Sequence, residues 1–259
     1  MSQTKVIDIR GRKLGGETPL ICSPLVGRTR ERVLAEVANV VAKRPDVIEW
    51  RVDYFEHIAD PKAVVDVAAA MRKAAGDMPV IFTRRSVKEG GEKIAIGDAD
   101  VVRLYDAVGA SGHVDFIDFE MGNDPEHVRL VRESTRTHGA RLILSYHNFG
   151  FTPGVEFLVQ RFLEAERLGA DVAKVAVMPR DRGDVLALLA ATAQADAKAR
   201  IPLISMAMGP LGSVTRMIGG VFGSALSFAV GEGSSAPGQI PIADLNAVYD
   251  VIRRARGGA

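Results

Sequence analysis

Cysteine is nearly absent from this sequence, since Cys22 is its single occurrence in 259 residues. One cysteine cannot form an intramolecular disulfide, so a disulfide-stapled scaffold is excluded and a reducing compartment is favoured. Because Cys22 lies among apolar residues, we expect it to pack as a small hydrophobic side chain.

The sequence also lacks an excess of one charge and any long hydrophobic run. The net charge is +1 and the basic residues are spread along the chain. This distribution indicates no basic patch for binding a nucleic acid and no polybasic surface for binding a membrane. No window reaches the ~18 apolar residues of a membrane span, and the first residues lack the pattern of a signal peptide. We expect a cytoplasmic protein whose partner is a small molecule, and no binding to nucleic acid or membrane.

Motifs for metals and nucleotides are missing as well. The sequence contains no H-E-x-x-H, no paired C-x-x-C and no acidic calcium loop. It also contains no phosphate-binding G-x-x-x-x-G-K-[ST] and no G-x-G-x-x-G that follows a predicted strand. We therefore expect neither a metal nor a cofactor.

Short apolar runs recur along the chain at intervals of about thirty residues, the length of one β-α unit. Between them lie Ala- and Leu-rich segments with apolar residues at three- and four-residue spacings, which predicts helices. Eight such units in about 250 residues predict one (β/α)8 TIM barrel domain, residues 1–259, rather than a doubly wound sheet. The predicted strands are Leu20–Val26, Val47–Val52, Val80–Thr83, Val114–Phe119, Arg141–Tyr146, Val172–Val177, Pro202–Ala207 and Ser224–Ala229, and the predicted helices include Glu31–Ala42, Pro61–Ala75, Val155–Leu168, Arg182–Ala195 and Ile242–Arg254.

The segment Lys5 to Glu17 precedes the first predicted barrel strand. In it, Ile7 and Ile9 alternate with polar residues ahead of Gly15-Gly16, which is typical of a short β-hairpin. We expect this hairpin to close the amino-terminal mouth of the barrel.

Lys174 lies in the apolar segment Asp171 to Met178, whose β-branched residues predict a buried strand. Burial penalises the ammonium form, so a neutral amine becomes available near neutral pH to attack a carbonyl. This predicts an imine-forming enzyme. Two structural alternatives stay open: Lys174 pairs with a carboxylate, or its side chain reaches solvent at the strand end.

Ionisable residues gather at the predicted strand ends, which meet in one mouth if the chain is a barrel. Side chains alternate along a strand, so Glu49, Arg51 and Asp53 share one face and form either a substrate site or a structural ion-pair cluster. Asp118 and Glu120 on the fourth strand could support neighbouring cations.

His147 ends the predicted strand that precedes the strand of Lys174, and it is one of only five histidines. Histidine titrates near neutral pH, so this position predicts a general acid/base, with a structural histidine as the alternative. Arg216 could clamp a carboxylate, since a guanidinium binds it in a bidentate manner.

Two loops complete the set of candidates. The polar loop Thr83 to Glu92 contains glycines that permit close approach, and it could bind hydroxyl groups or lie on the surface. The small residues of Gly231 to Gln239 are typical of a mobile lid or of a plain surface connection.

Five segments together resemble type I 3-dehydroquinate dehydratases, in that family's order and near its spacings, over nearly the whole chain. The resemblance implies a (β/α)8 barrel, commonly a homodimer, that dehydrates 3-dehydroquinate to 3-dehydroshikimate in the shikimate pathway without a cofactor. The segments are Glu49-Trp50-Arg51-Val52-Asp53, Arg85-Ser86-Val87-Lys88-Glu89-Gly90-Gly91, Ser145-Tyr146-His147, Ala173-Lys174 and Ser235-Ala236-Pro237-Gly238-Gln239.

By the same resemblance, Lys174 is the imine-forming lysine and His147 is the acid/base. Glu49 is a third catalytic candidate, which either orients His147 or accepts a hydrogen bond from a substrate hydroxyl. Two positions depart from the family pattern, namely Asn148 in place of Asp and Thr215 in place of Ser. The resemblance implies further substrate contacts at Arg51, Arg85, Glu89, Arg216, Ser235 and Gln239.

Two other interpretations remain. A class I aldolase also carries a lysine on a barrel strand, but often binds phosphate through glycine-rich backbone amides, for which Gly219-Gly220 is available. A catalytically silent barrel would keep the shape and bind ligands without turnover. The presence of both Lys174 and His147 argues against a silent barrel.

Overall fold

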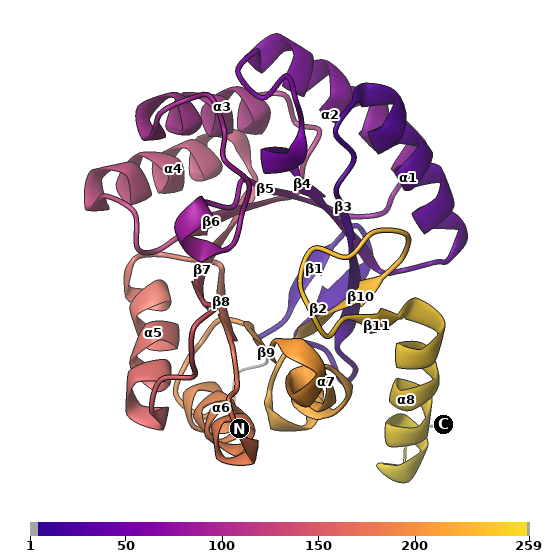
Figure 1. Ribbon diagram of the computed structural model, residues 1–259, viewed down its shortest axis with the longest axis vertical. Helices are drawn as coiled ribbons and strands as arrows, with labels where there is room; N and C mark the ends of the chain where they lie inside the picture. The colour runs from indigo at the N-terminus through magenta and orange to yellow at the C-terminus, as the bar shows by residue number, and fades with distance from the viewer. Residues whose placement is uncertain (1–4, 258–259) are drawn as a thin grey trace.

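A parallel barrel forms the centre of the structure, a computed structural model that describes residues 5–257 (Figure 1). Its strands are β3 (Leu20–Leu25), β4 (Val47–Arg51), β5 (Val80–Thr83), β6 (Phe116–Glu120), β7 (Arg141–Asn148), β8 (Val172–Val177), β9 (Leu203–Ala207), β10 (Leu226–Val230) and the short β11 (Ile240–Pro241). They pair in chain order from β3 to β9, and β10 pairs with both β3 and β11. The barrel closes where the Ala225 N–H donates to the Leu203 carbonyl oxygen at 2.7 Å. The predicted (β/α)8 fold is confirmed.

Helices surround the barrel, with one on the outer side after each barrel strand (Figure 1). In α2, Asp60 caps the first turn by accepting the Lys62 and Ala63 N–H groups, and Pro61 occupies the first helical position, where its missing N–H costs nothing. The helices are α1 (Arg30–Ala42), α2 (Pro61–Ala75), α3 (Asp98–Ala110), α4 (Pro125–His138), α5 (Val155–Arg167), α6 (Arg182–Asp196), α7 (Gly209–Ile218) and α8 (Ile242–Ala255).

Two hydrophobic layers follow from the alternation of side chains along the strands. Residues such as Trp50 and Val175 point outward and pack beneath the helices. Residues such as Cys22, Ile81 and Ile204 point inward and fill the barrel. Cys22 is fully buried, as expected of a small packed side chain.

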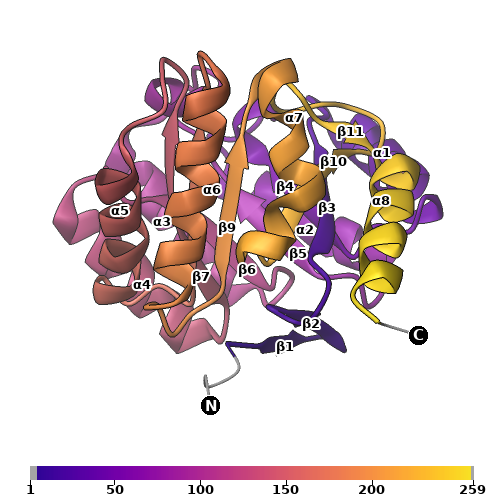
Figure 2. The ribbon, with the colours of Figure 1, turned by 90° about the horizontal axis from the view of Figure 1, so that it is seen from below.

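A β-hairpin crosses the amino-terminal end of the barrel (Figure 2). It consists of β1 (Ile7–Ile9) and β2 (Arg12–Leu14), which pair antiparallel. Leu14 is 1% exposed and belongs to the hydrophobic cluster inside the barrel. The hairpin therefore closes this end, as the sequence predicted, and leaves the opposite end for a ligand. Among residues 5–257, no helix is both long and apolar enough to cross a bilayer.

Candidate active site

A cavity of about 40 Å³ opens at the carboxyl ends of the strands, the end opposite the hairpin. Eight of the nine site residues expected from the sequence line it, and the ninth, Arg216, contacts Met206 and Phe228 of its wall. The barrel thus gathers side chains from six strands and their loops around one small space. The lining residues are Glu49, Arg51, Arg85, Glu89, Gly90, His147, Phe149, Lys174, Ala176, Met206, Met208, Phe228, Ser235, Ala236 and Gln239.

Lys174 lies on β8 with its side chain inside the barrel, and the residue is 3% exposed. Its Nζ donates to Asp118 Oδ2 at 2.8 Å and to Glu49 Oε1 at 3.5 Å, and it lies 4.5 Å from the ring centre of Phe228. The alternative of pairing with a carboxylate is therefore realised. Nζ therefore lies between two carboxylates and an aromatic ring rather than among apolar groups alone.

Asp118 is the main anionic partner of Lys174, and it is fully buried. Besides Lys174, its carboxylate accepts Arg85 Nη2 at 2.8 Å and the Ser145 hydroxyl at 2.7 Å. Burial by itself raises the pKa of Asp118, but Arg85 and then Lys174 outweigh it and hold that pKa well below its usual range. Asp118 thus keeps a fixed negative charge beside Nζ. The sequence had indicated that Asp118 could support cations but had not placed it in the site.

His147 and Glu89 form a buried pair at the edge of the cavity. Glu89 Oε2 lies 2.8 Å from His147 Nδ1 and accepts the His147 backbone N–H at 3.1 Å. Burial, followed by the charges of Arg85 and Lys174, lowers the pKa of His147 well below its ordinary value of 6.5. The imidazole is therefore neutral near pH 7, and Nε2 is the nitrogen that remains for a ligand.

The loop after β5 places Glu89 through a short 3-10 helix, η2 (Val87–Glu89). This helix ends at Gly90, whose φ is +84° and whose missing Cβ would come within 2.3 Å of the Phe149 ring. Only glycine fits both the backbone conformation and the space. Glu89 is buried, so the alternative of a solvated loop does not apply at this position.

Glu49 lies away from His147. Its Oε1 accepts the Thr83 hydroxyl at 2.9 Å and faces Lys174 Nζ. The contact that would orient the imidazole is made by Glu89 on the loop of η2, whereas β4 points Glu49 toward β5 and β8. Asn148 also turns away, since its side-chain oxygen accepts the backbone N–H groups of Gly150 and Phe151 in a turn.

The three arginines of the site differ in their partners. Arg51 holds both oxygens of Asp53 at 2.8 Å, and Arg85 binds Asp118 and Glu120. Arg216 is 1% exposed, yet its guanidinium has only neutral partners at 3.3 to 3.5 Å in the described part of the chain. Burial lowers the pKa of Arg216 to about 10, so it still carries its charge near pH 7. Arg216 is therefore a buried cation that an anionic ligand can neutralise.

Asp53, Asp118 and Glu120 form ion pairs with arginine side chains, and Glu89 is hydrogen-bonded to the neutral imidazole of His147. Across residues 5–257, no cluster of three or more His, Cys, Asp or Glu has the arrangement of a metal site. The acidic residues of this cavity therefore serve to balance and position its cations.

The segment Gly231 to Gln239 covers the mouth of the cavity. Its Ser235 carbonyl accepts Arg51 Nη1 at 3.5 Å, its Pro237 carbonyl accepts Arg216 Nη2 at 3.3 Å, and Gln239 Nε2 donates to the Ser235 hydroxyl at 3.3 Å. These contacts are long for hydrogen bonds to charged groups. The start of the segment is anchored, since Glu232 accepts Arg32 Nη2 at 2.5 Å and Asn39 Nδ2 at 2.8 Å, whereas the part from Ser235 to Gln239 is held by the longer contacts, which is the geometry expected of a lid.

Gly219-Gly220 lies at the other end of the barrel. Both glycines belong to the 3-10 helix η3 (Gly219–Phe222), and a Cβ on Gly220 would lie 2.2 Å from Pro19 at the start of β3. The backbone there does not line the cavity of Lys174. The phosphate-binding segment that the aldolase hypothesis needed is thus absent from this mouth.

The arrangement as a whole combines an amine, a neutral imidazole and an unneutralised guanidinium around one enclosed space. An amine condenses with a ketone or aldehyde, and a neighbouring imidazole can move a proton on the adjacent carbon. The guanidinium selects for a carboxylate or another planar anion.

Comparison with known proteins gives consistent similarities. Residues 21–256 match the family model described as type I 3-dehydroquinase. The chain is 56% identical over 258 residues to the 3-dehydroquinate dehydratase of Albidiferax ferrireducens, covering 99% of this chain and 98% of the relative. The crystal structure of the Geobacillus kaustophilus enzyme of the same name superimposes with a TM-score of 0.95 at 46% identity, covering 96% and 97% of the two chains. The type I enzyme of Clostridium difficile, solved with covalently modified comenic acid, gives 0.94 at 35% identity over 98% and 100%.

Proposed function

The chain belongs to the type I 3-dehydroquinase family and is a hydro-lyase acting on 3-dehydroquinate, and we propose that Lys174 and His147 are its covalent and acid/base groups. The product is 3-dehydroshikimate, an intermediate of the shikimate pathway. One observation supports these roles above all. Lys174 and His147 line the same cavity, and Arg216, which has no acidic partner among the described residues, lies beside it.

The reaction begins when the Lys174 amine, after loss of one proton, attacks the substrate ketone. Loss of water gives an iminium, which withdraws electrons and acidifies the adjacent carbon. With Glu89 ionised and accepting the Nδ1 proton, His147 takes the proton from that carbon through Nε2, and the resulting imidazolium then protonates the departing β-hydroxyl. Water leaves, and hydrolysis of the iminium releases the product and restores the Lys174 amine.

Two carboxylates support these steps. Asp118, 2.8 Å from Nζ, stabilises the positive charge both on the resting ammonium and on the iminium that replaces it. Glu89 holds Nδ1 of His147 and so directs Nε2 toward the substrate. Glu49 lies beside Nζ as well, and we assign to it a contact with the reacting oxygen or a ring hydroxyl.

Arg216 binds the substrate carboxylate. It is the cationic side chain of the site that lacks an acidic partner in residues 5–257, whereas Arg51 and Arg85 are already neutralised. Arg51 and Arg85 therefore contact the substrate's hydroxyl groups rather than its carboxylate. Ser235 and Gln239 complete the hydroxyl contacts when the lid closes, which also excludes water from the iminium.

The cellular location and the oligomeric state of the enzyme are part of the same proposal. We place it in the cytoplasm, as the single buried Cys22 fits a reducing compartment, and we propose a homodimer of one-domain chains, as in the family it resembles. Sedimentation at micromolar concentration tests the oligomeric state. A sedimenting species of 27.8 kDa, the mass of one chain, would exclude the dimer.

Intact-protein mass spectrometry after borohydride treatment with 3-dehydroquinate tests the mechanism. We expect a substrate-dependent adduct on the wild type and on the control Lys198→Ala, an exposed lysine, and none on Lys174→Ala. Turnover without an adduct would contradict the covalent mechanism. An adduct without turnover would indicate a silent barrel, and neither adduct nor turnover would mean that the assignment of substrate is wrong.

A further inference from the structure

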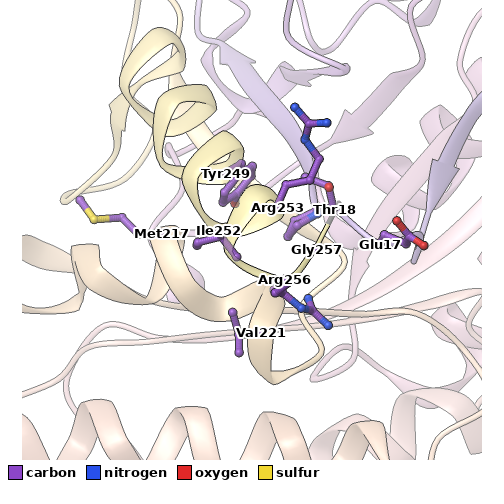
Figure 3. A pocket seen from close by; sticks show the side chains of 11 residues that line it. Glu17, Thr18, Met217, Val221, Tyr249, Ile252, Arg253, Arg256 and Gly257 are labelled. Atoms are coloured by element: carbon purple, nitrogen blue, oxygen red, sulfur yellow. The ribbon is translucent and has the colours of Figure 1, made fainter. Parts of the chain in front are cut away.

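A second cavity, of about 280 Å³, lies at the amino-terminal end of the barrel, between the start of β3 and the last turns of α7 and α8 (Figure 3). It is separate from the cavity of Lys174, since the two share no lining residue. Its volume is sufficient for a molecule the size of a substituted benzene ring. Nothing in the proposed reaction uses it.

The charges around this cavity favour an anion. Arg253 and Arg256 line it, and Glu17 is its one acidic lining residue in the described part of the chain (Figure 3). Arg253 also pairs with Asp250 at 3.3 Å. Within residues 5–257, no ion pair or side-chain hydrogen bond occupies Arg256, so its guanidinium can receive a ligand.

Backbone hydrogen bonds compensate part of the negative charge at the carboxyl end of α8. A helix carboxyl end exposes carbonyl oxygens that repel negative charge. In this structure, the backbone N–H of Arg256 donates to the carbonyls of Ile252 and Arg253, and that of Gly257 donates to Arg254. These bonds cap the last turn, and the arginines project from it around the cavity.

The floor of the cavity is apolar. Met217, Val221 and Ile252 line it together with the ring of Tyr249 (Figure 3). Val221 is 52% exposed, which is unusual for a valine that already lines a cavity. A ligand with an apolar body would cover this surface and gain the corresponding burial.

The cavity is linked to the active site through the backbone of Arg216. The Tyr249 hydroxyl donates to the Arg216 carbonyl oxygen at 2.9 Å, and Met217 is the next residue of α7. A molecule that packs against Tyr249 and Met217 therefore acts on the same helical turn that positions the Arg216 guanidinium.

We propose that this cavity binds a small carboxylate with an apolar, ring-sized body and that its occupancy changes the affinity of the active site for substrate. Arg256 binds the carboxylate, and the Met217, Val221 and Ile252 surface binds the body. The binding site stands independently of the proposed function, whereas the coupling rests on Arg216 as the group that binds the substrate carboxylate. By linkage, substrate changes the affinity for the ligand by the same factor.

Nuclear magnetic resonance of protein with ¹³C-methyl methionine tests the site, with benzoate as the probe. We expect a saturable shift of the Met217 signal, identified with Met217→Leu, that persists when 3-dehydroshikimate fills the active site. Arg256→Ala should weaken binding by about threefold to fivefold, as for one exposed ionic contact. Arg254→Ala, a neighbouring exposed arginine outside the cavity, should leave binding unchanged, and Val221→Trp should block it.

Several results would contradict the proposal that this cavity binds a small apolar carboxylate. If benzyl alcohol binds as tightly as benzoate, the carboxylate does not contribute to binding. If inorganic phosphate binds as tightly as benzoate, the apolar body does not contribute. Equal losses in the Arg256 and Arg254 variants would mean non-specific attraction. Displacement by 3-dehydroshikimate would place the probe in the active site instead.

Steady-state kinetics tests the coupling. With saturating benzoate, the wild type should show a KM for 3-dehydroquinate altered by about twofold or more, and Val221→Trp, which blocks the cavity, should show no change at the same benzoate concentration. An equal change in both proteins would reveal competition at Arg216 and refute the coupling. If the wild type binds benzoate but does not turn over 3-dehydroquinate, the proposed function fails while the site stands.

Discussion

A single oxygen of Glu89, Oε2, makes two hydrogen bonds with His147, one with Nδ1 of the imidazole and one with the backbone N–H. The double contact fixes the imidazole plane as well as its position. Glu89 is buried and the His147 side chain is only 9% exposed, so neither can change its protonation without affecting the other.

The first prediction concerns pH and stability at Glu89. Burial, opposed by Arg85, raises the pKa of Glu89 from 4.5 to about 8. Between these values the folded state holds a proton that the unfolded chain releases, so this contribution to stability is complete below about pH 4.5 and is lost as the pH rises to 8. Glu89→Gln removes the titration, so the free energy of unfolding of the variant relative to wild type should increase from pH 5 to pH 8.

Urea denaturation at pH 5, 6, 7 and 8 measures this difference. The difference in the free energy of unfolding cannot change by more than ~1.4 kcal/mol per pH unit, because only one proton is involved. The exposed control Glu31→Gln should give a flat difference. A flat difference for Glu89→Gln as well would show that Glu89 titrates alike in both states.

The second prediction separates proton transfer from imine formation. His147→Gln should lower kcat by about 10²- to 10⁴-fold, the usual contribution of a positioned acid/base, while borohydride still traps an adduct on Lys174. The exposed His57→Gln serves as the control with wild-type kcat. Wild-type kcat in His147→Gln would mean that another group moves the protons.

The third prediction concerns the carboxylate of the substrate. Arg216→Gln should raise KM on the order of 10- to 100-fold, as expected for the loss of a hydrogen bond to a charged group. Arg216→Lys should recover only part of this loss, since an ammonium cannot bind a carboxylate in a bidentate manner. Circular dichroism and thermal melting should confirm that both variants fold, and an unchanged KM in folded Arg216→Gln would refute the assignment.

The fourth prediction concerns the charge balance around Lys174. Asp118→Asn leaves two buried cations short of a partner and should destabilise the protein by about 3 kcal/mol or more. Adding Lys174→Met to this variant removes one of these cations and should restore part of the stability. Chemical denaturation of the two single variants and the double variant measures this coupling, and strictly additive losses would contradict it.

The strands were predictable because a buried parallel strand needs an unbroken apolar run. Val80–Thr83 and Val172–Val177 agree with β5 and β8 to the residue. The helices α3, α4 and α7 were not named from the sequence. In α4, only Val128, Val131 and Thr135 are buried, so its apolar stripe is narrow, and α7 begins with Gly209-Pro210, which is typical of a loop.

The pairing of side chains within the site was harder to predict from the sequence. That Lys174, His147 and Glu49 face the inside of the barrel follows from local alternation, but which carboxylate reaches which cation depends on strand order and register. Asp118 shares the inward face of β6 with Glu120, and this was the available signal for its place beside Lys174.

The sequence by itself determined the barrel, its closing hairpin and the residues able to form an imine and move a proton, because side-chain periodicity and residue chemistry are local properties of the chain. The tertiary structure alone decided that Glu89 rather than Glu49 holds His147, that Asp118 faces Lys174, and that Arg216 is left without a carboxylate. These pairings join residues 56 to 58 positions apart, as for Glu89 with His147 and Asp118 with Lys174. Only the closure of the barrel brings such residues within hydrogen-bonding distance.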